Sequence, residues 1–225
     1  MSDFPSELCG IRAFVFDVFG TVVDWCGSVA NELQLKSPGL AEDWESFAKE
    51  WRSGYYETTR RVAAGGDGPA NVDIMHRQIL DGMLESPRWQ HLAPLWDEAK
   101  RQELVLIWHR LEGWPDATKG LYALKSKAII GTLSNGNVRL LVDMAKHADL
   151  PWDVIFSGEL LGSYKPNPKV YLGALHHLSL APNECALVAA HIFDVRAAAS
   201  HGMKTVYVLG RDVELIVLRG LRGFQ

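Results

Sequence analysis

The chain has 225 residues, and its 23 lysine and arginine residues against 27 aspartate and glutamate residues give a formal charge of -4. This mild acidity, without a block of like charge, argues against nucleic acid and membrane surfaces as partners. No apolar run is long enough to span a bilayer and no basic leader precedes the first strand, so a cytoplasmic location is expected. Three scattered cysteines predict neither a disulfide framework nor a zinc site.

The first predicted element is a buried strand at residues 13–16, four apolar residues that end at Asp17 and are followed by Gly20. Helical patterns of crossover length separate the later apolar runs, as in a parallel sheet. These later runs predict four more strands, at residues 128–133, 154–157, 186–190 and 205–209. The sequence therefore predicts an α/β fold with a doubly wound, Rossmann-like parallel sheet.

A segment of about a hundred residues separates the first two strands, which is far too long for a simple crossover. It contains no convincing strand, and its apolar residues follow helical spacing. They form three sets: Trp44, Phe47, Trp51 and Tyr55; Val72, Met75 and Ile79; and Leu104, Ile107, Trp108 and Leu111. We predict an inserted helical cap at residues 25–113, a catalytic core at 11–24 and 114–212, and an atypical tail at 213–225.

Polar residues follow the predicted strands directly. Because reactive groups gather at the carboxyl ends of neighbouring parallel strands, these residues are the first candidates for a functional site. They are Asp17 to Thr21, Ser134 to Gly136, Lys165, and His191 to Asp194.

Four short motifs carry these residues in a fixed order. They are F-D-V-F-G-T at 16–21, T-L-S-N-G-N at 132–137, Y-K-P-N-P at 164–168 and A-A-H-I-F-D at 189–194. Together they resemble the motifs of the haloacid dehalogenase superfamily, from about residue 11 to about residue 211. The Ser-Asn-Gly and Tyr-Lys-Pro forms are most similar to its type II 2-haloacid dehalogenase branch.

The resemblance implies that Asp17 is a nucleophile that displaces halide from carbon and forms an ester, which water then hydrolyses. A carboxylate can do this only if it is ionised and aligned, so Lys165 would supply the balancing charge and Asp194 would orient Lys165. The alternative for Asp17 alone is a turn or helix-capping aspartate. These three residues are the predicted catalytic set.

The predicted substrate-binding residues lie around that set. Ser134 and Asn135 precede a helix, where unpaired N–H groups favour an anion such as a substrate carboxylate, although either could simply cap the helix. The resemblance places Arg52 beside the leaving halide and Tyr171 near the active site. Arg52 could instead be a solvated helix residue, and Tyr171 could serve helix packing. Thr21, from the first motif, completes this set with His191.

The sequence departs from two patterns of the superfamily. Phe19 and Ala190 stand where magnesium-dependent members carry acidic residues, and neither side chain has an oxygen for a hard cation. No metal or other cofactor is therefore expected. Ala189 and His191 replace the serine and asparagine of the dehalogenase branch. His191 could help to activate water or shape a halide pocket, or it could be a packed, hydrogen-bonded histidine.

Three functions remain open from the sequence. The favoured one is metal-independent hydrolysis of small 2-haloalkanoic acids to 2-hydroxy acids. The alternatives are a magnesium-dependent small-molecule phosphatase and a catalytically silent protein that binds a small acid or a protein partner. The expected partner is a small carboxylate substrate, and an apolar cap helix together with the resemblance also predicts a homodimer.

Overall fold

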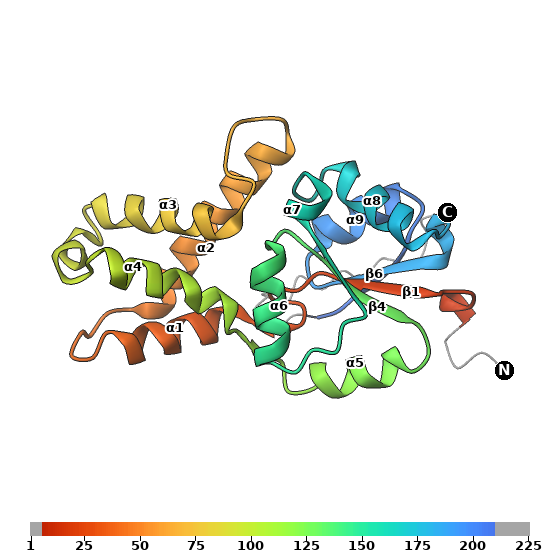
Figure 1. Cartoon of the computed structure of the whole chain (residues 1–225), viewed down its shortest axis with the longest axis horizontal. Coiled ribbons are helices and arrows are strands. Elements are labelled where there is room, and N and C mark those ends of the chain that lie inside the picture. Colours follow the sequence, from red (N-terminus) through yellow and green to blue (C-terminus); the bar gives the residue numbers. More distant parts are fainter. Residues whose placement is uncertain (1–5, 210–225) are drawn as a thin grey trace.

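A parallel sheet forms the centre of one half of the molecule in the computed structural model, which describes residues 6–209 (Figure 1). Every strand pair in this sheet is parallel. Across the sheet the five described strands are β5 (Val154–Ser157), β4 (Ile129–Ser134), β1 (Ala13–Phe16), β6 (Cys185–Ala189) and β7 (Lys204–Tyr207). All five predicted strands are therefore present, with ends that differ by up to two residues.

Helices cover both faces of the sheet. Phe14 and Phe16 of β1 pack into the cluster that includes residues of α5 and α6, whereas Ala13 and Val15 pack into the cluster that includes α8 and α9. This alternation follows from the period of two along a strand. The flanking helices are α5 (Ala117–Lys125), α6 (Val138–His147), α8 (Pro168–Leu178) and α9 (Ile192–Ser200). The predicted doubly wound fold is confirmed.

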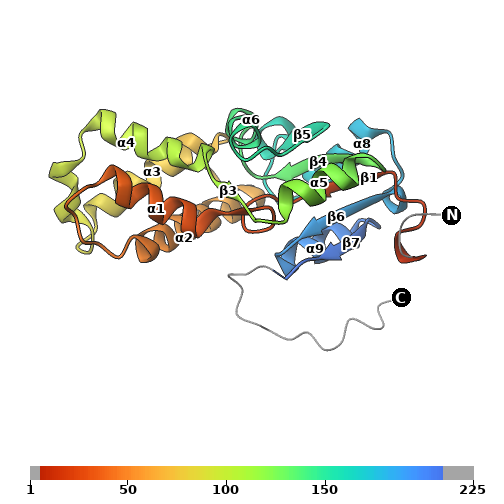
Figure 2. The ribbon, with the colours of Figure 1, turned by 90° about the horizontal axis from the view of Figure 1, so that it is seen from below.

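The helices within residues 25–109 lie together beyond one end of the sheet (Figures 1 and 2). Their largest side chains, including Phe47, Trp51 and Trp108, are fully buried among one another. These helices are α1 (Trp25–Lys36), α2 (Trp44–Ala63), α3 (Val72–Glu85) and α4 (Glu98–Val105), with 3-10 turns η2 (Gln90–Leu95) and η3 (Leu106–His109). The domain boundaries placed around this segment stay a prediction.

Two details of this segment differ from the prediction. The helix expected through Leu111 ends as α4 at Val105 and continues as the 3-10 turn η3, which keeps an i, i+3 spacing and so produces a similar burial pattern. A short antiparallel pair was also missed, β2 (Val23–Asp24) with β3 (Glu112–Gly113). Strands of two residues are too short to show alternation. This pair lies where the chain leaves the sheet and where it returns.

Three short elements complete the described chain, namely η1 (Ser6–Leu8), α7 (Gly158–Leu161) and η4 (Pro182–Glu184). No helix within residues 6–209 is long and apolar enough to cross a membrane. The predicted tail at 213–225 lies outside the described residues.

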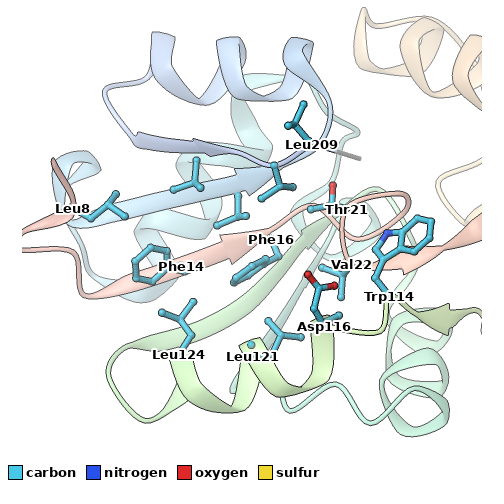
Figure 3. Close-up of a pocket in the computed structure, with 15 residues that line it drawn as sticks. Leu8, Phe14, Phe16, Thr21, Val22, Trp114, Asp116, Leu121, Leu124 and Leu209 are labelled. Atoms are coloured by element: carbon cyan, nitrogen blue, oxygen red, sulfur yellow. The ribbon is translucent and has the colours of Figure 1, made fainter. Parts of the chain in front are cut away.

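An apolar groove of about 410 Å³ lies on the sheet face beside α5 (Figure 3). Phe14 and Phe16 of β1 line it from the sheet, and Leu121 and Leu124 line it from α5. Leu209, the last described residue, lies at its edge. Its lining is almost entirely apolar, so the groove offers no set of groups for chemistry.

His109 links the helical segment to the sheet-bearing half. Its side chain is only 5% exposed, its Nδ1 is 2.9 Å from Asp143 of α6, and its Nε2 is 3.0 Å from Asp73 of α3. Burial alone would lower the pKa of His109, but the hydrogen bonds and charges of Asp73 and Asp143 raise it above its ordinary value. Arg139 also pairs with Asp143, from the solvent side.

Replacing His109 with asparagine is expected to cost about 2 kcal/mol of stability at low pH, since hydrogen bonds to charged groups are worth roughly that much. The pKa of His109 is higher in the folded protein than in the unfolded chain, where it is about 6.5. The stabilisation is therefore complete at pH values below about 6.5, and it declines as the pH rises through the pKa of the folded protein. Denaturant unfolding from roughly pH 6 to pH 9 should show the difference from the parent shrinking. The exposed His176→Asn is the control, and a difference independent of pH would contradict the assignment.

Candidate active site

Asp17 sits at the carboxyl end of β1, where its backbone N–H still donates to Val188 of β6, at 3.0 Å. The chain then turns sharply at Gly20, whose φ of +85° few side chains tolerate. A Cβ at Gly20 would also lie 3.4 Å from His191 Cε1, so this tight turn packs closely against His191. Asp17 itself is only 8% exposed.

Lys165 joins the two predicted catalytic carboxylates. Its Nζ donates to Asp17 Oδ1 at 2.9 Å and forms a second, shorter ion pair with Asp194. The other oxygen of Asp194 accepts from the Tyr171 hydroxyl at 2.7 Å. Tyr171 is fully buried and its described contact supports Asp194, while its predicted place near the substrate stays a prediction.

The pKa shifts in this network favour a charged nucleophile. Burial alone would raise the pKa of Asp17, but the charge of Lys165 and the nearby His191 side chain hold this pKa well below its usual range. Burial likewise opposes the charge on Lys165, yet Asp17 and Asp194 raise its pKa. Asp194 shows the reverse balance, because burial raises its pKa and the nearby Asp17 adds to that rise. Asp17 is therefore the carboxylate that stays ionised most readily.

The second oxygen of Asp17 has two further neighbours. The Thr21 hydroxyl donates to Oδ2 at 2.7 Å and itself accepts from the backbone N–H of Ala190 at 2.9 Å. His191 Nδ1 lies 3.0 Å from the same Oδ2. Both Thr21 and His191 therefore contact the nucleophile candidate, and their predicted contact with substrate stays a prediction.

Arg52 of α2 lies in an aromatic cage defined by Phe19, Trp25, Tyr55 and Tyr56. Its guanidinium carbon is 4.3 to 5.6 Å from the four ring centroids. The residue is 4% exposed, so it is not the solvated helix residue considered from sequence. Within residues 6–209, Nε and Nη1 of Arg52 are buried without a hydrogen-bond partner.

This guanidinium stays charged despite its burial. Burial lowers the pKa of Arg52, but Tyr56, Tyr55 and Asp17 together raise it. Among the described residues, the guanidinium donates one hydrogen bond, from Nη2 to the Tyr56 hydroxyl at 3.4 Å. A buried cation with two unused donors has the character of an anion site.

The loop after β4 carries Ser134 and Asn135. Ser134 is the last residue of β4, is fully buried, and accepts from the backbone N–H of Gly136 at 3.3 Å. Asn135 Oδ1 accepts from the backbone N–H of Lys165 at 2.7 Å. The N-cap of α6 is Asn137, so neither predicted residue caps that helix. Asn135 thus joins the hydrogen-bonded cluster of Asp17, Thr21, Lys165, Tyr171, His191 and Asp194, whereas the described side-chain hydrogen bond of Ser134 stays within its own loop.

A cavity of about 310 Å³ opens beside this cluster. Tyr56 and Thr59 of α2 line one side, and Asn135, Lys165 and Phe193 line the other. It connects the helical segment to the carboxyl ends of the strands. The apolar groove beside α5 is lined by Thr21 of the hydrogen-bonded cluster, whereas this cavity is lined by Lys165 and Asn135 and is our candidate for the substrate-binding space.

The residues do not fit a magnesium ion. Phe19 is buried with its ring against Arg52, and Ala190 supplies only backbone, so two expected oxygen ligands are missing. Both oxygens of Asp17 already face Lys165, Thr21 or His191. A divalent cation at this place would meet a lysine ammonium where it needs oxygen atoms.

Sequence reasoning missed Tyr56 and most of the aromatic cage. Tyr56 follows Arg52 by four residues on one helix, a spacing that places the two side chains next to each other and could have revealed the pair. Phe19 was noted only as a lost metal ligand. Its contact with the guanidinium depends on how α2 packs against the loop after β1, and no local pattern encodes this.

A family model for haloacid dehalogenase-like hydrolases matches residues 11–202, and the chain belongs to this family. It is 30% identical over 210 residues to (S)-2-haloacid dehalogenase 4A of Burkholderia cepacia, a match that covers 88% of this chain and 83% of the relative. The predicted superfamily is therefore confirmed.

Two solved structures extend the comparison. The crystal structure of an L-2-haloacid dehalogenase superposes with a TM-score of 0.81 at 40% identity, covering 88% of this chain and 83% of the other. The L-2-haloacid dehalogenase of Xanthobacter autotrophicus, with chloropropionic acid covalently bound, superposes with a TM-score of 0.73 at 26% identity, covering 88% and 77%. Both superpositions therefore cover most of this chain.

Proposed function

We propose that this protein is a hydrolase of carbon–halogen bonds that converts small (S)-2-haloalkanoic acids to 2-hydroxy acids through an ester on Asp17. The observation that carries this proposal is the pairing of an ionised carboxylate, held by Lys165, with the buried Arg52 whose Nε and Nη1 have no partner among the described residues. The enantiomer follows the names of the relatives, which are (S)- and L-2-haloacid dehalogenases.

The first step is displacement at carbon. Asp17 Oδ2 accepts from Thr21 and lies 3.0 Å from His191, whereas among the described side chains Oδ1 accepts a hydrogen bond from Lys165 alone. Oδ1 therefore keeps the lone pair that is available for attack. It forms a bond to the carbon bearing the halogen, and the halide leaves with the bonding electron pair, which gives an ester and a free halide ion.

Arg52 is the group proposed to receive the halide. Its cage of four rings excludes water, and its Nε and Nη1 can donate to an anion without breaking an existing bond. The 2-carboxylate of the substrate is assigned to the loop of Ser134 and Asn135, which precedes α6 and borders the cavity. The substrate is then held between a cation for the halide and an N–H-rich loop for its carboxylate.

In the second step, water adds to Cγ of Asp17 and the bond between Cγ and Oδ1 breaks. The hydroxyl oxygen of the product comes from Asp17, the oxygen of water stays in the carboxyl group, and that group releases one proton to solvent on ionising. The balance is one halide ion, one proton and one 2-hydroxy acid for each haloacid and water consumed.

The phosphatase alternative is less well supported, because Phe19, Ala190 and the cation at Lys165 leave no oxygen cage for magnesium. The silent alternative is less well supported because a protein that only binds acids has no use for a buried carboxylate kept ionised beside an unpartnered guanidinium. A cytoplasmic location, the absence of nucleic-acid partners and a homodimer stay predictions.

The decisive test measures halide release from the separate enantiomers of 2-chloropropionate with an excess of EDTA. We expect release from the (S) enantiomer, at a rate that neither EDTA nor added magnesium changes. Hydrolysis of p-nitrophenyl phosphate in the same preparation should be absent. Turnover of the phosphate ester that EDTA abolishes would favour the phosphatase, and binding of either acid without turnover would favour the silent protein.

A further inference from the structure

Tyr56 connects the two functional parts of the site. It lies one helical turn after Arg52 on α2, and its hydroxyl is 3.4 Å from Arg52 Nη2 and 2.9 Å from His191 Nε2. His191 in turn reaches Asp17 Oδ2 through Nδ1, at 3.0 Å. Arg52, Tyr56, His191 and Asp17 thus form one continuous chain of polar contacts from α2 to the end of β1, and Tyr56 of this chain lines the cavity.

Chemistry fixes the direction of these hydrogen bonds. An ionised Asp17 can only accept, so Nδ1 of His191 must carry a proton. In a neutral imidazole, Nε2 is then the acceptor, and the Tyr56 hydroxyl donates to it. The lone pairs of that hydroxyl are left to accept from Arg52. Every hydrogen in the chain therefore points toward Asp17.

This arrangement leaves His191 without a free lone pair. Nδ1 is protonated and faces Asp17, while Nε2 accepts from Tyr56. A histidine held in this way can donate to an oxygen but has no nitrogen available to take a proton from water. Thr21 donates to the same Oδ2, so this oxygen has two donors aimed at it.

We propose that Tyr56 is a positioning residue that holds His191 as a hydrogen-bond donor to Oδ2 during ester hydrolysis. This inference rests on the proposed function. When water adds to Cγ, the electron pair of the C=O bond moves to Oδ2, and the negative charge is stabilised there by His191 and Thr21. The pair returns as the bond between Cγ and Oδ1 breaks; the departing oxygen takes one proton of the added water, and the other proton passes to solvent.

The test separates the two steps of turnover in Tyr56→Phe, which keeps the ring over Arg52 and loses only the hydroxyl. We expect ester hydrolysis to slow by about tenfold or more, since losing one oxyanion donor outright costs about 10²-fold or more. Halide release in the first turnover should change by less than about threefold. Rapid quench with intact-protein mass spectrometry should then show the ester accumulating on Asp17.

Variants of His191 separate a donor from a base. His191→Asn places an N–H near the position of Nδ1 but cannot act as a base, and we expect it to keep hydrolysis within about tenfold, whereas His191→Leu should lose more. In the His191→Asn background, Tyr56→Phe should have no further effect, because the residue acts only through His191. Tyr122→Phe, which removes a surface hydroxyl bonded to Asp149, is the matched control.

Three outcomes would overturn the inference. In the first, Tyr56→Phe leaves the rate of ester hydrolysis unchanged relative to the rate of halide release. In the second, His191→Asn loses as much of the hydrolysis rate as His191→Leu does. In the third, Tyr56→Phe slows hydrolysis in the His191→Asn background as strongly as it does in the parent. If Tyr56→Phe does not fold, the comparison of the two His191 variants decides the question. Failure of the proposed function is distinct, because the parent protein would then release no halide at all.

Discussion

Asp17→Asn is expected to lose at least about 10⁴-fold in halide release from (S)-2-chloropropionate, because an amide oxygen lacks the negative charge needed to displace halide. The shape of the side chain is nearly unchanged, and Lys165 keeps its pair with Asp194, so the fold should remain intact. Ion chromatography of released chloride measures the effect. Mass spectrometry of the parent during turnover should show an adduct that the variant never forms.

The matched control for this variant is Asp67→Asn, the same change on an exposed loop residue. It should leave chloride release and thermal unfolding as in the parent. If Asp17→Asn still releases chloride at a rate near that of the parent, another group is the nucleophile, and the whole mechanism built on Asp17 is wrong.

Arg52→Met is expected to lower the rate of halide release by about three decades. A guanidinium about 4 Å from a departing anion is worth roughly 4 kcal/mol at an effective dielectric constant near 20. The loss falls on the first step, so no ester should accumulate, which is the opposite of the result expected for Tyr56→Phe. Single-turnover measurements with the bromo and chloro acids distinguish these two patterns.

The same substitution should not destabilise the protein. Arg52 is buried without a carboxylate partner among the described residues, and a methionine of similar length fits the same aromatic surroundings without the cost of a buried charge. Thermal unfolding is therefore expected at or above the parent temperature. Arg61→Met, an exposed position on the same helix, is the control for activity. A rate for Arg52→Met near that of the parent would remove Arg52 from the mechanism.

The sheet and its catalytic edge were predictable because the signals are local. Each strand is a short apolar run, and each candidate group follows one directly, so the meeting of Asp17, Lys165 and Asp194 is a consequence of parallel strands ending at one edge. The four motifs added order and spacing. Together they located the hydrogen-bonded cluster without any knowledge of side-chain orientation.

The surroundings of the cluster were not predictable in the same way. The roles of Thr21 and Tyr171 depend on which neighbour each hydroxyl finds, and both hydroxyls point to carboxylates of the cluster. Tyr56 and the aromatic cage arise from packing between α2 and the loop after β1, two segments whose contact has no sequence period. The strands β2 and β3 were missed because pairs of two residues have no pattern to detect.

The pair β2 and β3 has a consequence for how this architecture can change over evolution. Val23 and Gly113 are paired, so the helical insertion begins and ends at adjacent points of the structure. A segment with adjoining ends can be exchanged as a unit between related proteins with little strain at the junctions. Such an exchange would replace the residues proposed to surround the leaving halide, since Arg52 and Tyr56 lie within the segment. It would leave Asp17 and Lys165 in place. Recognition of the halogen and the displacement chemistry could then diversify independently.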